Sequence, residues 1–119
     1  MTHSYRTLDS EQIFTGRVIS VRRDRVQMSD GTVAEREVIG HPGAVGIVAL
    51  DDQQRVLLVT QYRHPVRAWL DELPAGLLDV DGEPPLVAAQ RELAEEAHAT
   101  AEQWHTLVDL YTSPGMCHC

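Results

Sequence analysis

One segment of this chain has the apolar periodicity of an α-helix, and that segment limits the folds open to the rest. Two prolines, Pro84 and Pro85, come first. Proline suits the first turn of a helix, because its missing N–H needs no partner there. Apolar residues then recur at steps of three and four: Leu86, Ala89, Leu93 and Ala97. We therefore predict one amphipathic helix with a single buried face.

The remainder is typical of short β-strands separated by turns. Strands are predicted at residues 13–21, 25–28, 33–39, 44–50, 55–62 and 104–111. Residues 29–32, Ser-Asp-Gly-Thr, are a turn signal, and Gly-His-Pro-Gly at 40–43 breaks the chain. The continuous apolar run at 44–50 suits a strand buried on both faces. These patterns predict an α/β protein, with antiparallel strands in residues 1–40 and a second domain at 41–119.

Charge and composition argue against several classes of function. The formal net charge is −8 at pH 7, so the chain lacks the positive surface that nucleic-acid binding needs. No run of about 18 apolar residues occurs, so we expect no membrane-spanning helix. The first residues lack the basic-then-apolar pattern of a signal peptide. We therefore expect a cytoplasmic location, with no nucleic-acid or membrane partner.

The two cysteines, Cys117 and Cys119, flank His118. Binding of a soft metal ion is one interpretation, although three candidate ligands on a frayed segment make a poor site. Thiols are usually free in cytosolic proteins. We therefore expect free thiols at both positions.

Three carboxylates on the predicted helix are the strongest candidate for chemistry. Glu92, Glu95 and Glu96 fall at i, i+3 and i+4, so they project from adjoining patches of one side. A solvated acidic face is the simpler interpretation. However, these residues lie in the last two turns, where the helix dipole disfavours negative charge by roughly 0.3–1 kcal/mol each. A divalent cation would neutralise them, and carboxylates are suitable ligands for Mg²⁺ or Mn²⁺.

The residues around this cluster resemble the motif of a known family. Gly76, Glu83 and the run 91–96, Arg-Glu-Leu-Ala-Glu-Glu, are similar to the Nudix box, with the seven residues between Glu83 and Arg91 intact. Six residues rather than five separate Gly76 from Glu83, and His98 replaces the closing glycine. If residue 98 must adopt a left-handed conformation, that replacement costs about 1 kcal/mol. The resemblance implies an α/β/α sandwich with a mixed β-sheet.

The resemblance also implies roles for individual residues. Catalysis and metal binding would fall to Glu92, Glu95 and Glu96, with the backbone carbonyl of Ala75 as a further metal ligand. Glu83 and Arg91 would form a structural ion pair, although from the residues alone an exposed pair worth under about 1 kcal/mol is equally plausible. The cofactor would be Mg²⁺ or Mn²⁺.

Flanking segments are similar to the ADP-ribose pyrophosphatases of this family. They are the Gln-Tyr-Arg-His-Pro of residues 61–65 and the Leu-Pro-Ala-Gly-Leu-Leu-Asp-Val of residues 73–80. In this subfamily Arg36 and Glu37 match positions that contact the adenosine half of the substrate, often across a homodimer. Arg63 matches an arginine near the phosphates. An arginine on a strand is also a common surface residue, so each match is weak by itself.

Together these features predict metal-dependent hydrolysis of ADP-ribose to AMP and ribose 5-phosphate. The cations would neutralise the diphosphate and lower the pKa of a water molecule. In this subfamily further strands, a helix and an acidic loop follow the Ser-Pro-Gly of residues 113–115, whereas this sequence ends at Cys119. The sheet therefore looks incomplete at its C-terminal end. The alternative is a catalytically impaired, truncated remnant that binds metal or nucleotide without turnover.

Overall fold

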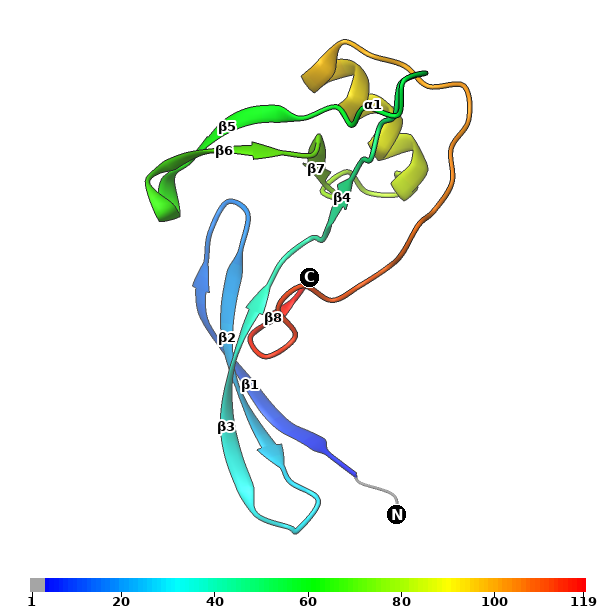
Figure 1. The fold of residues 1–119 in the computed structure, drawn as a ribbon. Helices are drawn as coiled ribbons and strands as arrows, with labels where there is room; N and C mark the ends of the chain where they lie inside the picture. Colours follow the sequence, from blue (N-terminus) through cyan, green and yellow to red (C-terminus); the bar gives the residue numbers. More distant parts are fainter. Residues whose placement is uncertain (1–3) are drawn as a thin grey trace. The chain divides into compact units, whose positions relative to one another are not determined.

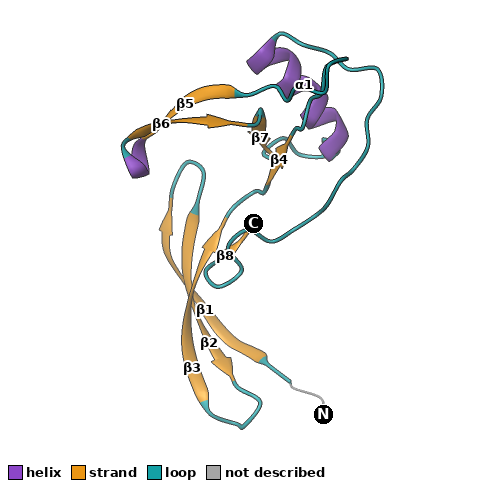
Figure 2. Ribbon diagram, in the orientation of Figure 1, coloured by secondary structure: helices purple, strands orange, loops and turns teal. Residues whose placement is uncertain are grey.

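The computed structural model describes residues 4–119, which fall into two compact units (Figure 1). The first unit contains the residues up to Pro42 together with Asp109–Cys119, and the second contains Gly43–Val108. Strands occur in both units, and the one α-helix of the described residues belongs to the second (Figure 2). The α/β class expected from the sequence is confirmed.

The first unit is a sheet of four strands. They are β1 (Arg6–Thr15), β2 (Ser20–Gln27), β3 (Val33–Gly40) and the short β8 (Cys117–His118), in the order β1-β2-β3-β8. The first three pair antiparallel and β8 pairs parallel to β3, so the sheet is mixed. At the β2–β3 turn, Asp30 accepts hydrogen bonds from the backbone N–H and hydroxyl of Thr32. The turn signal at residues 29–32 is therefore confirmed.

The expectation of one strand over residues 13–21 is wrong. The chain turns at Gly16, whose N–H donates to the carbonyl of Ile19 at 2.8 Å. Thr15 and Ser20 then face each other as the last pair of the β1–β2 ladder. Apolar residues at 18 and 19 hid this turn in the sequence. Only Gly16 marked it, and a Cβ there would lie 2.8 Å from the Phe14 ring.

The second unit contains two pairs of antiparallel strands. β4 (Ala44–Gly46) pairs with β7 (Ala75–Leu77), while β5 (Val59–Arg63) pairs with β6 (Ala68–Glu72). A single 3₁₀ turn, His64–Val66, joins β5 to β6. β5 is shorter than the strand expected at 55–62, since Val56 forms only an isolated bridge with Leu50.

Helix α1 (Pro85–Ala97) covers the β4–β7 pair and forms the core of the second unit with it. Ala89 and Leu93 from the helix pack with Ile47, which follows β4. Pro85 is the first helical residue and Pro84 is the N-cap, as the sequence indicated. Leu86, expected on the buried face, is instead 49% exposed, because the core cluster lies farther along the helix, toward Trp104.

Two other strand expectations need correction. In residues 44–50 only alternate side chains turn inward, and Val48 and Leu50 are about half exposed. The helix covers one side of this segment, so the strand is not buried on both faces. Residues 104–111 form no strand, because no described strand pairs with them; Leu107 is 76% exposed.

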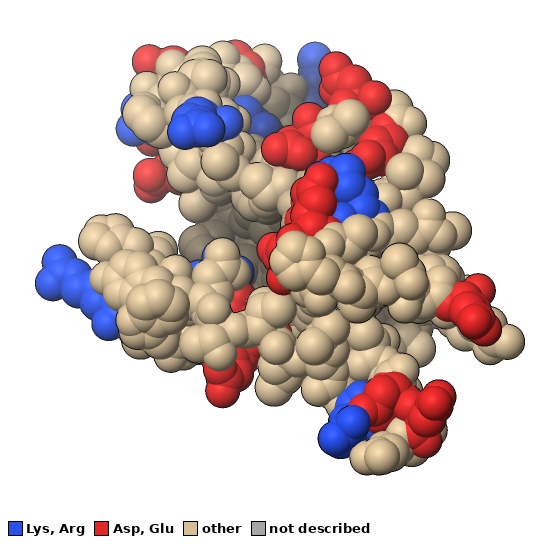
Figure 3. Space-filling model, turned by 90° about the horizontal axis from the view of Figure 1, so that it is seen from above, with Lys and Arg blue, Asp and Glu red and all other residues tan. Residues whose placement is uncertain are grey.

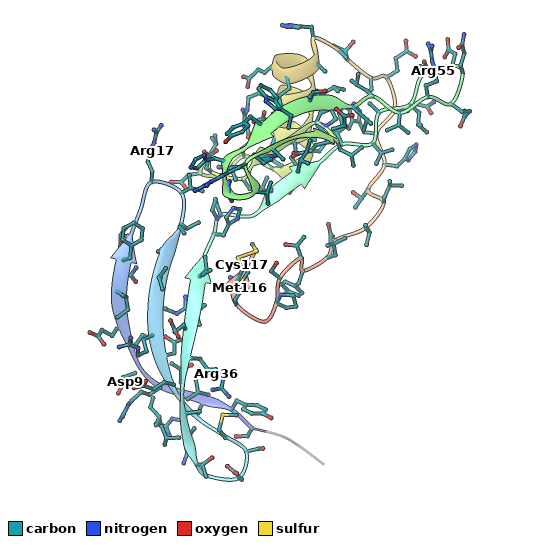
Figure 4. All side chains as sticks on the ribbon, turned by 60° about the vertical axis from the view of Figure 1, so that its left-hand side comes forward. Asp9, Arg17, Arg36, Arg55, Met116 and Cys117 are labelled. Carbon is teal, nitrogen blue, oxygen red and sulfur yellow. A yellow bond between two sulfur atoms is a disulfide. The ribbon has the colours of Figure 1, made fainter. Side chains whose placement is uncertain are left out.

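The cysteines also differ from expectation. Cys117 and Cys119 are joined by a disulfide rather than carrying free thiols (Figure 4 shows Cys117). Cys117 belongs to β8, opposite Ile39 of β3. Among residues 4–119, no helix is long and apolar enough to cross a membrane. The cytoplasmic location stays a prediction.

Helix α1 ends in a left-handed residue, at the position where the resemblance places a glycine. His98 is the C-cap with φ 52° and ψ 37°, and its N–H donates to the carbonyl of Ala94 at 3.0 Å. A residue with a Cβ is disfavoured there, because the Cβ approaches the following carbonyl oxygen. The helix nevertheless continues to Ala97, so the strain at His98 does not shorten the helix.

We expect His98→Gly to raise the free energy of unfolding by about 1 kcal/mol, because glycine adopts the left-handed conformation without strain. Ala97→Gly, one residue earlier and inside the helix, should lower it by about 0.5–1 kcal/mol. Urea denaturation followed by circular dichroism measures both. Equal destabilisation by the two substitutions would mean that residue 98 is not left-handed in solution.

Candidate metal centre

Helix α1 directs two of its three candidate carboxylates toward strand β7. The carboxylate of Glu92 lies directly over Gly76, and the backbone N–H of Ala75 donates to Glu96 at 3.2 Å. Glu92 and Glu96 are one turn apart, while Leu93 between them points into the core. One stretch of helix therefore supplies both the packing against β7 and the acidic groups above it.

The register of the β4–β7 pair leaves the backbone of Ala75 available on the side away from β4. Ile47 N–H donates to the carbonyl of Pro74, and Leu78 N–H donates to the carbonyl of Gly43. These bonds make Ala75 and Gly46 a non-hydrogen-bonded pair, in which N–H and C=O point away from the partner strand. The N–H meets Glu96 on that side, and the carbonyl of Ala75 points the same way.

The position of the Glu92 side chain over β7 requires a glycine at position 76. An added Cβ at Gly76 would lie 2.5 Å from Oε1 of Glu92 and closer still to two of its carbon atoms. Any other residue would push Glu92 away from the strand or move the helix. The glycine that opens the motif is therefore explained by its contact with Glu92 of the same motif.

Glu83 and Arg91 form a two-point ion pair. Arg91 Nη2 donates to Glu83 Oε1 at 2.9 Å and Nε donates to Oε2 at 3.2 Å. The Glu83 side chain is only 14% exposed. The hydrogen bonds from Arg91 lower the pKa of Glu83, and Glu83 in turn raises the pKa of Arg91. This pair ties the loop before α1 to the middle of the helix.

Arg91 also serves the acidic cluster. Its Nη1 donates to Glu92 at 2.9 Å and reaches Glu95 at 3.4 Å. A single guanidinium therefore contacts three carboxylates and offsets part of the repulsion among them. Figure 3 shows, on the face viewed from above, acidic side chains adjoining basic ones rather than forming an uninterrupted patch.

The donor set fits a hard divalent cation, although its members are not gathered around one point. Among residues 4–119, no three His, Cys, Asp or Glu side chains are grouped to hold a metal ion. Glu95 is turned to Arg91, whereas Glu92 and Glu96 lie against β7. Carboxylate and carbonyl oxygens are nonetheless the ligand type that Mg²⁺ and Mn²⁺ require.

A second arginine lies near this site. Arg63, the last residue of β5, is held by Glu72, the last residue of β6, and also experiences the charge of Glu96. Hydrogen bonds from Arg63 lower the pKa of Glu72. Sequence reasoning missed Glu72. The available signal was the β5–β6 register, which could be inferred only if both strands were recognised.

The two residues expected to contact the adenosine half belong to the first unit. Arg36 and Glu37 lie on β3 and line a groove of about 500 Å³ with the C-terminal segment that includes Met116 and Cys117 (Figure 4). Arg36 is exposed, and its Nη1 donates to the backbone carbonyl of Glu35. All the other expected site residues belong to the second unit.

Comparison with known proteins agrees with this arrangement. The NUDIX domain model matches residues 40–117, and a nucleoside diphosphate sugar hydrolase N-terminal domain model matches residues 5–39. The chain belongs to the NUDIX domain family. The box of this family therefore consists here of β7, the loop that carries Glu83, and the C-terminal half of α1.

Related proteins of the family are longer than this chain. It is 51% identical over 113 residues to an ADP-ribose pyrophosphatase of Mycobacterium tuberculosis (strain ATCC 25618 / H37Rv), covering 95% of this chain and 55% of that protein. It is 42% identical over 110 residues to a methanol dehydrogenase activator of Bacillus methanolicus, covering 92% and 59%. A crystal structure of an ADP compounds hydrolase superposes with a TM-score of 0.83 at 27% identity, covering 95% and 61%. The chain thus spans less than two thirds of each relative's length.

The Glu83–Arg91 pair should make stability depend on pH in the acidic range. The pKa of Glu83 is lowered in the folded state. The contribution of Glu83 to the free energy of unfolding is therefore fully present above the ordinary glutamate pKa of 4.5, and it is lost as the pH falls through the folded-state pKa. We expect Glu83→Gln to lower the melting temperature at pH 7, with the difference from wild type shrinking below about pH 4.5. Thermal unfolding followed by circular dichroism from pH 7 to pH 3 measures this.

Glu102→Gln is the matched control for that series. Glu102 is exposed and forms no ion pair with any residue of the described chain. Its substitution should leave the melting temperature close to wild type across the whole range. If the melting temperature of Glu83→Gln stays below that of wild type by the same amount at pH 3, a role for the ionised carboxylate is contradicted.

Proposed function

We propose that the protein catalyses divalent-metal-dependent hydrolysis of a nucleoside diphosphate linked to a second group, with ADP-ribose as substrate and AMP and ribose 5-phosphate as products. The observation that carries this proposal is the convergence of Glu92 and Glu96 on Ala75 and Gly76 of β7. Family membership and the similarity to an ADP-ribose pyrophosphatase support it.

In this proposal Glu92, Glu95 and Glu96, with the carbonyl of Ala75, hold Mg²⁺ or Mn²⁺. Bound divalent cations would neutralise the diphosphate oxygens and lower the pKa of a water molecule. Arg91 would prepare the site, because its hydrogen bonds to Glu92 and Glu95 hold the two side chains near one another before a cation binds. The unfavourable position of these carboxylates at the end of α1 is then a cost of the site.

Substrate recognition would come from arginines outside the box. Arg63 would contact a phosphate, which is consistent with its position near Glu96. Arg36 and Glu37 would contact the adenosine half, and the groove that they line is large enough for a small ligand. The two curated relatives described above carry different functional names, so substrate preference must be measured on a panel.

With Mg²⁺, the protein should release AMP from ADP-ribose with a higher kcat/KM than from other nucleoside diphosphate derivatives or from nucleoside triphosphates. Glu92→Gln/Glu96→Gln should lower this activity and the Mn²⁺ affinity by at least about 100-fold, exceeding the 10- to 100-fold typical of outer-shell partners. Coupled AMP assays and Mn²⁺ titration by electron paramagnetic resonance measure the two effects.

Glu102→Gln again supplies the control, because it removes one negative charge outside the proposed site. It should change neither quantity. Equal Mn²⁺ affinities for the double variant and wild type would contradict the assignment of the metal centre. Intact Mn²⁺ binding without turnover of any compound on the panel would favour the non-catalytic metal-binding alternative.

We also propose that the protein is a homodimer formed through the first unit. Among the described residues of β1–β3, only Asp24 is buried. Phe14, Val21 and Ile39 face one another across the three strands in the ladder and so form an apolar row on one face of the sheet. Phe14 is 54% exposed. Such a sheet is stable only when an apolar face is covered, and a second copy would cover it.

Light scattering coupled to size exclusion should therefore give about twice the chain mass of 13.3 kDa at micromolar concentration. Phe14→Arg should shift the protein to the mass of one chain, because it places a charge in the apolar row. Val66→Arg, at a residue 63% exposed in the second unit, is the control and should leave the dimer intact. A wild-type protein with the mass of one chain would contradict the proposal.

A further inference from the structure

The contact between Arg63 and Glu72 has a particular geometry. Nε of Arg63 donates to both carboxylate oxygens of Glu72, at 3.0 and 2.8 Å, and Nη2 donates to Oε1. Glu72 therefore binds the side edge of the guanidinium, which is formed by Nε and Nη2. Arg63 is about half exposed, whereas the Glu72 side chain is 22% exposed. The carboxylate is the better-fixed partner of the two.

The pair runs along the β5–β6 hairpin rather than straight across it. In the ladder Arg63 faces Ala68 and Glu72 faces Val59, so both side chains lie on one face but at opposite ends. Arg63 must therefore extend back along the hairpin to reach its partner. Glu72 is three residues before Ala75, so this extension brings the guanidinium toward the carboxylates above β7, where the charge of Glu96 acts on it.

The same geometry leaves the far edge of the guanidinium available. An arginine has five N–H donors, and the side-edge contact uses only Nε–H and one hydrogen of Nη2. Nη1 of Arg63 forms no hydrogen bond to any residue between 4 and 119. The Nη1–Nη2 edge therefore keeps the fork that binds two oxygens of a phosphate.

We propose that Glu72 is a positioning residue that fixes Arg63 so that its free Nη1–Nη2 edge binds a phosphate of the substrate beside Glu92 and Glu96. The proposal rests on the function proposed above and assigns Glu72 a part in it. Without Glu72, the exposed Arg63 side chain would sample many rotamers, and Glu96 would compete for it as another carboxylate whose charge acts on it. The carboxylate thus orders the arginine before the substrate binds.

If the Arg63–Glu72 pair served only to hold the hairpin together, substitutions in the hairpin would have different effects on phosphate binding. The hairpin offers a matched control on its other face, where the Thr60 hydroxyl donates to Asp71 at 2.6 Å. Asp71→Asn disturbs this exposed cross-strand contact next to Glu72 without touching Arg63. A structural role predicts similar behaviour for Glu72→Gln and Asp71→Asn, whereas positioning predicts that only Glu72→Gln alters phosphate binding.

The test uses inorganic pyrophosphate with Mg²⁺ as the probe and needs no turnover. Calorimetry on the full chain should show that Arg63→Ala and Glu72→Gln each raise the dissociation constant by about 10- to 100-fold. The double variant should be no worse than Arg63→Ala alone, since Glu72 acts only through Arg63. Asp71→Asn should bind like wild type. An unchanged constant for Glu72→Gln, or effects that multiply in the double variant, would overturn the proposal.

A second measurement avoids substitutions altogether. In ¹H–¹⁵N spectra of the wild type, the Arg63 Nε–Hε signal should be protected from exchange, and pyrophosphate should shift the Nη signals while leaving Nε–Hε protected. Absence of any shift, or loss of the Nε–Hε signal on addition, would contradict the assignment. Glu72-dependent pyrophosphate binding in a protein that does not hydrolyse ADP-ribose would support the positioning role and count against the proposed function alone.

Discussion

The close contact between helix α1 and strand β7 is the constraint on which the second unit depends. Leu93 packs into the core beneath the helix, and the neighbouring Glu92 is thereby brought over Gly76. The absence of a side chain at Gly76 leaves room for the Glu92 carboxylate. The core of the unit is small, with Ile47, Ala89 and Leu93 at its centre. The position of the acidic groups is therefore set by hydrophobic packing, which acts on the same turn of helix.

The sequence predicted best what depends on neighbours along the chain. The helix start at Pro84–Pro85, the turn at 29–32 and strand β3 follow from local signals and are found in the structure. A left-handed conformation at His98 was only a condition raised by the missing glycine, and the structure has it. These features need only a few adjacent residues, so one sequence is sufficient to identify them.

Features that depend on distant partners were predicted poorly. Residues 104–111 have a strand-like pattern but no neighbour to pair with in the described chain. The turn at Gly16 is a local feature, but it was missed because it lies inside an apolar stretch. In the site, the spacing of Glu92, Glu95 and Glu96 is visible in the sequence. Family resemblance implied only that the Ala75 carbonyl is a metal ligand, and the hydrogen bond from Ala75 N–H to Glu96 was not predicted. Glu72 was missed because its role requires the hairpin register.

Strand β8 gives the chain an unusual order of assembly. Cys117 pairs with Ile39, so a sheet begun by the first forty residues gains its last strand only after the whole second unit has been synthesised. Closing so long a loop costs conformational entropy, but the cost grows only slowly with loop length. The edge of β3 at Ile39 and Gly40 therefore stays unpaired until the second unit and the segment after it have been synthesised.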